Sequence, residues 1–240
     1  MWEYSGRGNV ALRRFPYTLS MFRKAIASLI LAVPASLFAQ VTLDGPYQVN
    51  YASHLDLADG VVNVTNSGAS AGSNVPVVNF NSYGDICVNA YVYAPDQELA
   101  ACCSCLVSPN SLHSWPVSFG TSNLLHNVNN TTVLASINAT HSVVIKLLAT
   151  APNGIPALTD SCPRPDSPNG VVNGLVAWGT HSHPTNVPGA ALTETQFVNS
   201  SLSTGELGKL TNDCRASLTT GSGSQCPGCL TGGLDLGTSL

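Results

Sequence analysis

The sequence has little charge. Asp, Glu, Lys and Arg make up 9% of the 240 residues, far below the quarter that is usual in globular proteins. Beyond Gln40, four basic residues stand against twelve acidic ones, so this part of the chain carries a net charge of −8. Binding to nucleic acid requires clustered cations that displace counterions. The sequence therefore predicts that nucleic acid is not a partner.

The sequence also lacks the short motifs of common catalytic sites. It contains no Gly-x-Ser-x-Gly elbow, phosphate-binding loop, dinucleotide fingerprint or His-Glu-x-x-His motif. No catalytic residue is predicted. We therefore expect a non-enzymatic protein, although the sequence leaves open whether it catalyses a reaction of another kind.

A long apolar run occurs only near the N-terminus. Met21-Phe22-Arg23-Lys24 is short and basic, and the apolar residues 25–38 follow it. A membrane span needs roughly 20 apolar residues, so this run is too short, and it contains Pro34. The pattern is typical of a signal peptide cleaved after Ala39. We expect residues 1–39 to be an N-terminal extension and signal, whether or not residues 1–20 are translated. The rest would be secreted, periplasmic or on the cell surface, without a stable membrane span.

Short segments of alternating hydrophobicity dominate the remaining chain. In the clearest, Ile86, Val88 and Ala90 alternate with Cys87 and Asn89, the period of a β-strand. Strands are predicted at 41–51, 60–69, 75–80, 86–93, 99–107, 112–119, 133–137, 141–149, 171–179 and 191–197. Gly-, Pro- and Asn-rich turns separate them, and the five prolines of residues 151–170 predict a surface loop. The predicted fold is all-β: an antiparallel β-sandwich or open barrel within a single domain, residues 40–221.

One convincing helix is predicted near the C-terminus. Ser203-Thr204-Gly205-Glu206 matches a capping box. Leucines and Cys214 then recur at helical spacing, and Gly221 is a plausible end. We expect this helix to cover an open edge or end of the β-structure. A Gly- and Ser-rich tail that carries cysteines, residues 222–240, follows it.

The cysteines are the most informative residues. An even number in an exported chain favours a disulfide framework. The candidates are Cys87, Cys102, Cys103, Cys105, Cys162, Cys214, Cys226 and Cys229. Because Cys102 and Cys103 face opposite sides of a strand, they should serve different partners. We expect Cys87 to bond one member of the Cys102–Cys105 cluster. The helix and tail cysteines would bond the other members or Cys162.

Two other uses of the cysteines remain open. Cys103 and Cys105, with Cys226 and Cys229, could supply four thiolates to a zinc ion. Cys226-Pro227-Gly228-Cys229 also has the form of a redox motif. Such motifs normally begin a helix, whereas this one follows a helix, so structural disulfides are the favoured interpretation.

A histidine pair is the best candidate for metal chemistry. On an extended chain His181 and His183 point the same way, and Glu194 of the next predicted strand could be a third ligand. Imidazole and carboxylate groups in this pattern suit zinc or copper. The sequence therefore predicts an alternative function, an exported metal-binding protein or hydrolase. The competing interpretation is a solvated loop before Pro184.

Aromatic residues suggest a further alternative. If Tyr91, Tyr93, Trp115 and Trp178 were exposed, their rings could stack on a sugar or another small molecule. The chain would then be a glycan- or small-molecule-binding module.

Several segments together carry a resemblance. They are Gly60 to Ala69, Asp85 to Tyr93, the Cys102-Cys103-Ser104-Cys105 cluster, Val143 to Leu148 and Leu202 to Cys214. In these the chain resembles a group of uncharacterised predicted secreted proteins of soil bacteria. The resemblance implies export and a common fold, and it supplies no functional residue. The expected function is a secreted β-sandwich protein of the cell envelope or extracellular matrix, with a structural or surface-interaction role. Its partners would be surface or matrix molecules or further copies of itself.

Overall fold

The computed structural model of the protein describes residues 44–70, 84–118, 122–153, 161–186, 189–221, 224–226 and 228–232. All of them belong to one unit of the chain, Thr42–Leu240. The predicted signal peptide and the strand predicted at 75–80 lie outside the described residues. The strands are β1 (Tyr47–Ala52), β2 (Val61–Asn66), β3 (Ile86–Tyr93), β4 (Leu99–Val107), β5 (Leu112–Pro116), β6 (Val143–Thr150), β7 (Leu175–Pro184), β8 (Ala190–Gln196), β9 (Val198–Asn199), β10 (Ser224–Gln225) and β11 (Leu230–Thr231). The helices are α2 (Thr131–Thr140) and α3 (Thr204–Thr220).

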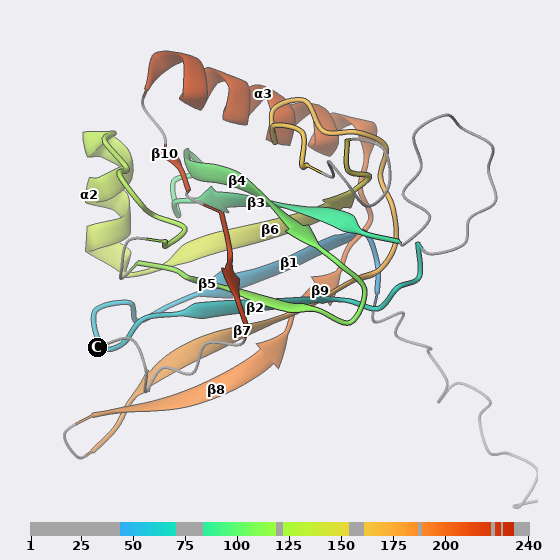
Figure 1. Ribbon diagram of the computed structural model, residues 1–240. Coiled ribbons are helices and arrows are strands. Elements are labelled where there is room, and N and C mark those ends of the chain that lie inside the picture. The colour runs from blue at the N-terminus through green and yellow to red at the C-terminus, as the bar shows by residue number, and fades with distance from the viewer. Residues whose placement is uncertain are drawn as a thin grey trace, which may run out of the picture. The chain divides into compact units, whose positions relative to one another are not determined.

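The strands form two sheets (Figure 1). One has six strands in the order β10-β4-β3-β6-β1-β9, and the other has five in the order β11-β5-β2-β7-β8. Neighbouring strands are antiparallel, except that β10 runs parallel to β4. The predicted disulfide-stapled, antiparallel all-β fold is confirmed.

The alternation of β3 explains how the layers are filled. Val88, Ala90 and Val92 belong to the main core between the sheets. Tyr91 and Tyr93, on the opposite face of the same strand, belong to a second apolar cluster. Both faces of β3 are therefore covered, and each of its eight residues is buried.

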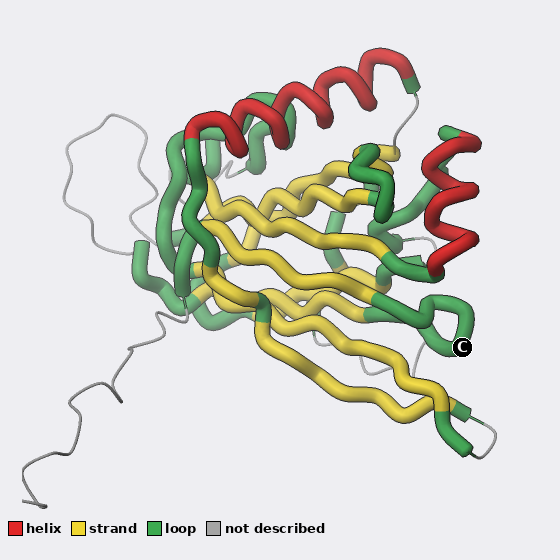
Figure 2. Tube along the Cα trace, turned by 180° about the vertical axis from the view of Figure 1, so that it is seen from behind, coloured by secondary structure: helices red, strands yellow, loops and turns green. Residues whose placement is uncertain are grey.

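Helix α3 covers the second face of the six-stranded sheet, as Figure 2 shows from behind. It begins where predicted, because the Ser203 side chain accepts a hydrogen bond from the Glu206 amide, and it ends at Gly221, whose φ is +66°. Leu210 and Cys214 are buried against the sheet tyrosines and Leu148. The prediction that this helix covers an open edge was wrong: its apolar stripe needs a broad surface, and the outward tyrosines of the sheet provide one.

A second helix replaces the strand predicted at 133–137. The Asn130 side chain accepts hydrogen bonds from the amides of Thr132 and Val133 and so begins α2. Val133 and Ile137, four residues apart, then point together into the core. The strand prediction at 133–137 is wrong, because the spacing of Val133 and Ile137 fits one face of a helix. No helix among the described residues is long and apolar enough to cross a membrane.

The chain passes from one sheet to the other on both open sides of the sandwich. We call β8, Phe197 and β9 the hairpin seam: β8 is the edge of the five-stranded sheet and β9 the edge of the six-stranded sheet. We call β10, Cys226, residues 228–229 and β11 the tail seam: β10 pairs with β4, and β11 pairs with β5. The tail is therefore part of both sheets, although its sequence has no strand periodicity.

Candidate functional site

The eight cysteines form four disulfides, and none among them is free. The bonds are Cys87–Cys162, Cys102–Cys214, Cys103–Cys226 and Cys105–Cys229, with Cα–Cα distances of 5.4, 5.9, 5.3 and 5.7 Å. As predicted, Cys102 and Cys103 serve opposite faces of β4. Cys102 bonds α3 on the outside of the sheet, and Cys103 bonds the tail beside the main core.

The predicted bond from Cys87 to the cluster was wrong. Cys87 lies opposite Leu106 of β4, whereas Cys102 lies opposite Tyr91. Four residues of strand separate these two positions, roughly 13 Å. Cys103 and Cys105 face the other side of the sheet, so no cluster sulfur is within reach. Cys87 instead bonds the proline-rich loop through Cys162.

The tail cysteines meet the cluster in two adjacent bonds. The structure brings together the four cysteines that could have formed a thiolate zinc site, and it pairs them as Cys103–Cys226 and Cys105–Cys229. Cys226 and Cys229 are not bonded to each other, so the Cys-Pro-Gly-Cys segment is not a redox disulfide of the usual form.

His113 joins this cluster and was not predicted. Its Nδ1 lies 3.2 Å from the Cys229 Sγ. His113, Cys105 and Cys229 are the one group of three such side chains in the described parts of the chain whose ligand atoms could hold a metal ion. Partial burial lowers the pKa of His113 below its ordinary value of 6.5. The pairing of β11 with β5 brings Cys229 to His113, and no local pattern in the sequence indicates that contact.

His181 and His183 lie on one face of β7, as the sequence predicted, but each forms a hydrogen bond with a threonine of β8. His181 Nε2 is 2.7 Å from the Thr195 Oγ1, and His183 Nε2 is 2.8 Å from the Thr193 Oγ1. His181 is buried, and His183 is exposed. Both therefore belong to a strand, not to the solvated loop of the competing interpretation.

Glu194 does not join the two histidines. It lies between Thr193 and Thr195 on β8 and so points to the opposite face of the sheet. There its carboxylate accepts a hydrogen bond of 3.1 Å from the Asn63 Nδ2. The structure thus brings together the two imidazoles and two hydroxyls, without the carboxylate that was predicted as a third ligand.

The environment of His181 disfavours a positive charge. Its ring contacts Tyr51 of the other sheet, with 4.6 Å between ring centroids. Its Nδ1 is buried and has no hydrogen-bond partner within the described segments. Burial first, and then the neighbouring His183, lower the pKa of His181 below 6.5. The side chain is therefore neutral at pH 7 and is part of the packing at the hairpin seam.

Three of the four aromatic residues considered for sugar stacking are buried. Tyr91 and Trp115 have no exposed surface, and Tyr93 is 4% exposed. The Tyr91 hydroxyl donates to the Pro165 carbonyl at 2.7 Å under the covering loop. These rings fill the interior and cannot stack on a bound sugar. Trp178, which is half-buried, keeps part of its ring accessible.

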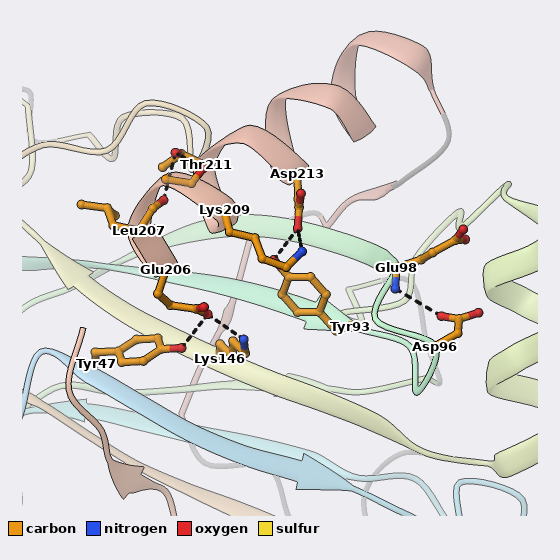
Figure 3. Close-up of polar contacts among 11 residues, drawn as sticks. Tyr47, Tyr93, Asp96, Glu98, Lys146, Glu206, Leu207, Lys209, Thr211 and Asp213 are labelled. Atoms are coloured by element: carbon orange, nitrogen blue, oxygen red, sulfur yellow. Dashed lines mark hydrogen bonds and ion pairs between the residues drawn. The ribbon is translucent and has the colours of Figure 1, made fainter. Parts of the chain in front are cut away.

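A polar network joins α3 to the sheet, as Figure 3 shows. Glu206 accepts hydrogen bonds from the Lys146 Nζ at 2.6 Å and from the Tyr47 hydroxyl at 3.0 Å. About two turns further along α3, Asp213 accepts from the Tyr93 hydroxyl at 3.0 Å and from Lys209. The Glu206 carboxylate therefore does not complete the predicted capping box, because it reaches down to the sheet instead.

The charges of this network are fixed near neutral pH. The hydrogen bond from Lys146 is the main cause that lowers the pKa of Glu206, which is therefore ionised. Burial and the adjacent carboxylates raise the pKa of Tyr47 and Tyr93 far above 10, so both remain phenols. A phenol that cannot ionise is a hydrogen-bond donor and a poor general base. The arrangement fits a clamp that holds α3 to the sheet.

A hollow of about 520 Å³ opens beside the proline-rich loop. Its lining residues are Ser104, Leu106, Cys162, Pro163, Arg164, Pro165, Cys226 and Gly228. Arg164 is the one charged residue among them, and its Nε lies 3.1 Å from the Asp166 carboxylate. The lining therefore offers a single, already paired cation and no acid–base pair.

Strand β8 is the most exposed of the strands that are longer than two residues. Its residues 191–195 are all exposed, on both faces of the strand, including Leu192 at 45%. It pairs with β7 on one side only and carries a single charged residue, Glu194. An edge strand of this kind offers unpaired backbone N–H and C=O groups to another strand.

No family model, curated protein or solved structure matches the chain. The function therefore has to be argued from the geometry above.

Proposed function

We propose that this protein is an exported, non-enzymatic β-sandwich that acts by binding a partner, and that the partner binds at strand β8. The partner we assign to this edge is a second copy of the chain. The observation that carries the proposal is the exposed, nearly uncharged edge of β8.

The four disulfides support an oxidising location. Disulfides are rare in reducing compartments and persist outside them. Together with the signal-like residues 21–39 they favour export to the periplasm, cell surface or medium. In such places a rigid domain often serves a structural or surface-interaction role.

The other sheet edges make β8 an exception. β9, β10 and β11 are each two residues long, and very short edge strands are one way in which proteins prevent edge-to-edge association. β8 has seven residues and no proline or lysine. The protection given to three edges is thus missing at the fourth.

One long edge strand favours a closed pair. Two copies of β8 can meet antiparallel around a two-fold axis, and the pairing then uses the longest of the four edge strands in each copy. Chain growth into a fibre would need two different adhesive edges. Each copy would contribute the seven residues of β8, well below the roughly 20–30 residues per side of a standard protein–protein interface. We therefore expect a weak dimer that depends on protein concentration.

The test is the mass of the exported protein by sedimentation equilibrium at rising concentration. The native chain should pass from monomer to dimer, and Leu192→Lys should shift the transition to at least tenfold higher concentration, because it places like charges beside the symmetry axis. Leu57→Lys is the matched control: Leu57 is 44% exposed, lies outside the strands and should leave the transition unchanged. A native chain that stays monomeric, or an equal effect of both variants, would overturn the proposal.

A further inference from the structure

The Cys105–Cys229 disulfide lies beside His113, and after reduction these three side chains would be the ligands of a metal site. The two sulfurs and the His113 Nδ1 all lie within 4.8 Å of one another. Around a tetrahedral zinc ion, two thiolates and an imidazole would be about 3.5–3.8 Å apart. Only a small displacement separates the present arrangement from that geometry.

The cluster would stay assembled after this disulfide is reduced. Cys226, three residues before Cys229, is bonded to Cys103 of β4. Directly after Cys229, Leu230 and Thr231 pair with Ser114 and His113 of β5. The tail is thus held on both sides of Cys229 by bonds that do not involve its sulfur.

The backbone next to Cys229 allows a small shift. Gly228 has a φ of +55°, and no atom of the described residues would contact a Cβ at that position. Cys105, by contrast, is fixed within β4 opposite Val88 and is 4% exposed. One ligand can move while Cys105 and His113 stay on their strands, which favours binding with little rearrangement.

We propose that Cys105, Cys229 and His113 are a redox-controlled zinc site: a disulfide in the oxidised protein, and a two-thiolate, one-imidazole Zn²⁺ site after reduction by a dithiol. Two cysteines and one histidine with a fourth position left for water is an established zinc ligand set. The site is independent of the β8 edge and uses none of its residues.

The conversion balances in atoms and electrons. A thiolate of the dithiol attacks the half-buried Cys229 sulfur, the S–S bond breaks, and Cys105 leaves as a thiolate. The second thiol of the reductant then attacks the reductant's first sulfur, which is bonded to Cys229 in the mixed disulfide. This step releases the Cys229 thiolate. The dithiol loses two electrons and becomes a cyclic disulfide, the protein disulfide gains them, and two protons are released as Zn²⁺ binds both thiolates.

The Cys87–Cys162 bond is an internal comparison. Cys162, like Cys229, is only half-buried, whereas both sulfurs of each of the other two disulfides are buried. Both half-exposed disulfides should therefore react with a dithiol first. No histidine or carboxylate completes a metal group around Cys87–Cys162 within the described residues, so zinc should be retained only at the tail.

The experiment treats the intact oxidised protein with limiting dithiothreitol, removes the reductant without oxygen, and adds Zn²⁺ alone. We expect about one zinc per molecule by elemental analysis after desalting, against none for untreated protein. Alkylation and peptide mass mapping should find Cys105 and Cys229 protected by zinc, and Co²⁺ in its place should give a thiolate-to-metal absorption band.

Two histidine variants separate a ligand from a merely structural residue. His113→Ala should lower zinc affinity by at least the roughly 10–100-fold that loss of an outer-shell partner costs, while the disulfide remains reducible. His126→Ala is the control, since His126 is equally half-buried and lies outside the cluster. His113→Asn is a second, milder replacement if the alanine variant does not fold.

The outcomes are decisive. Zinc that depends on His113 and protects Cys105 and Cys229 supports the site. The proposal is overturned if reduced protein binds no zinc, or if His113→Ala and His126→Ala both bind zinc as well as the native chain does. It is also overturned if the protein unfolds as soon as the Cys105–Cys229 bond is reduced.

Discussion

The two sides of the sandwich are crossed by the chain in different ways. On the tail seam, two disulfides join the crossing segment to β4, and the strands that flank them are two residues long. On the hairpin seam no cysteine is present. There the crossing depends on Phe197, which is 4% exposed, and on contacts such as that between Tyr51 and His181.

The difference separates two ways of joining sheets. Apart from its cysteines, the described part of the tail buries no apolar side chain in the core, so covalent bonds hold it in place. The hairpin seam has a long strand and a buried aromatic residue, so packing and backbone hydrogen bonds suffice, and the outer edge of β8 remains available. The tail seam is where a reductant should act, and the hairpin seam is where a partner should act.

The largest expected effect is at the hairpin seam. Phe197→Ala removes a ring that packs against Gly179, where a Cβ would lie 3.3 Å from it. Loss of a buried phenylalanine should lower the free energy of unfolding by about 3–5 kcal/mol in urea titrations. The neighbouring Val198→Ala, at a position that is 68% exposed, should change it by less than about 0.5 kcal/mol. Equal effects of the two variants would show that packing does not hold this seam.

The next effect is at the tail seam. Replacing Cys103 and Cys226 together by alanine removes a bond that spans 123 residues of sequence, and should lower the free energy of unfolding by about 2–4 kcal/mol. Far-ultraviolet circular dichroism should show that the sheets remain. If stability were unchanged, the Cys103–Cys226 bond would contribute nothing beyond the Cys105–Cys229 bond and the short strands β10 and β11, which would contradict a covalently held tail seam.

His181 at the hairpin seam should contribute to the pH dependence of stability. Because burial lowers the pKa of His181, the unfolded chain takes up a proton near pH 6.5 that the folded chain resists. Stability should therefore decline as the pH falls below about 6.5 toward the lower folded pKa. Urea titrations of the native protein and His181→Gln between pH 7.5 and 5.5 measure this.

The variant should show a shallower decline than the native protein. His113 shifts in the same direction, so the difference between the two proteins, not the total decline, is the informative quantity. Identical pH dependence would mean that His181 is protonated in the folded chain, and the buried Nδ1 would then need a partner.

The smallest effect concerns α3, which crosses neither seam. Glu206→Gln weakens the bonds to Lys146 and Tyr47, and should lower the free energy of unfolding by about 1 kcal/mol. Glu98→Gln, at an exposed position in a turn, should have almost no effect. A loss as large as that of Phe197→Ala would place the helix, and not the seams, at the centre of stability.

Much of the fold was predictable from local pattern. The alternation around Val88, the capping serine at Ser203 and the opposite faces of Cys102 and Cys103 each follow from one segment. Their consequences were confirmed: a β-sandwich, a helix that begins at Thr204, and separate partners for the adjacent cysteines.

The seams were not predictable in the same way. The tail has no alternating pattern, and its strands exist because two disulfides hold it against β4, from where β11 reaches β5. The contact of His113 with Cys229 joins residues 116 positions apart. Glu194 was predicted beside the two histidines, but neighbouring residues of β8 point to opposite faces of the sheet, and Glu194 lies on the other face. The strand predicted at 133–137 is helix α2, because the Asn130 side chain caps a helix there.

The most direct measurement of the central idea is amide hydrogen exchange of β8 at two protein concentrations. If a second copy pairs with this edge, exchange at Leu192 to Thr195 should slow as the concentration rises, while exchange at β9, β10 and β11 stays the same. Leu192→Lys should remove that dependence. Exchange in β8 that is fast and independent of concentration would contradict the account.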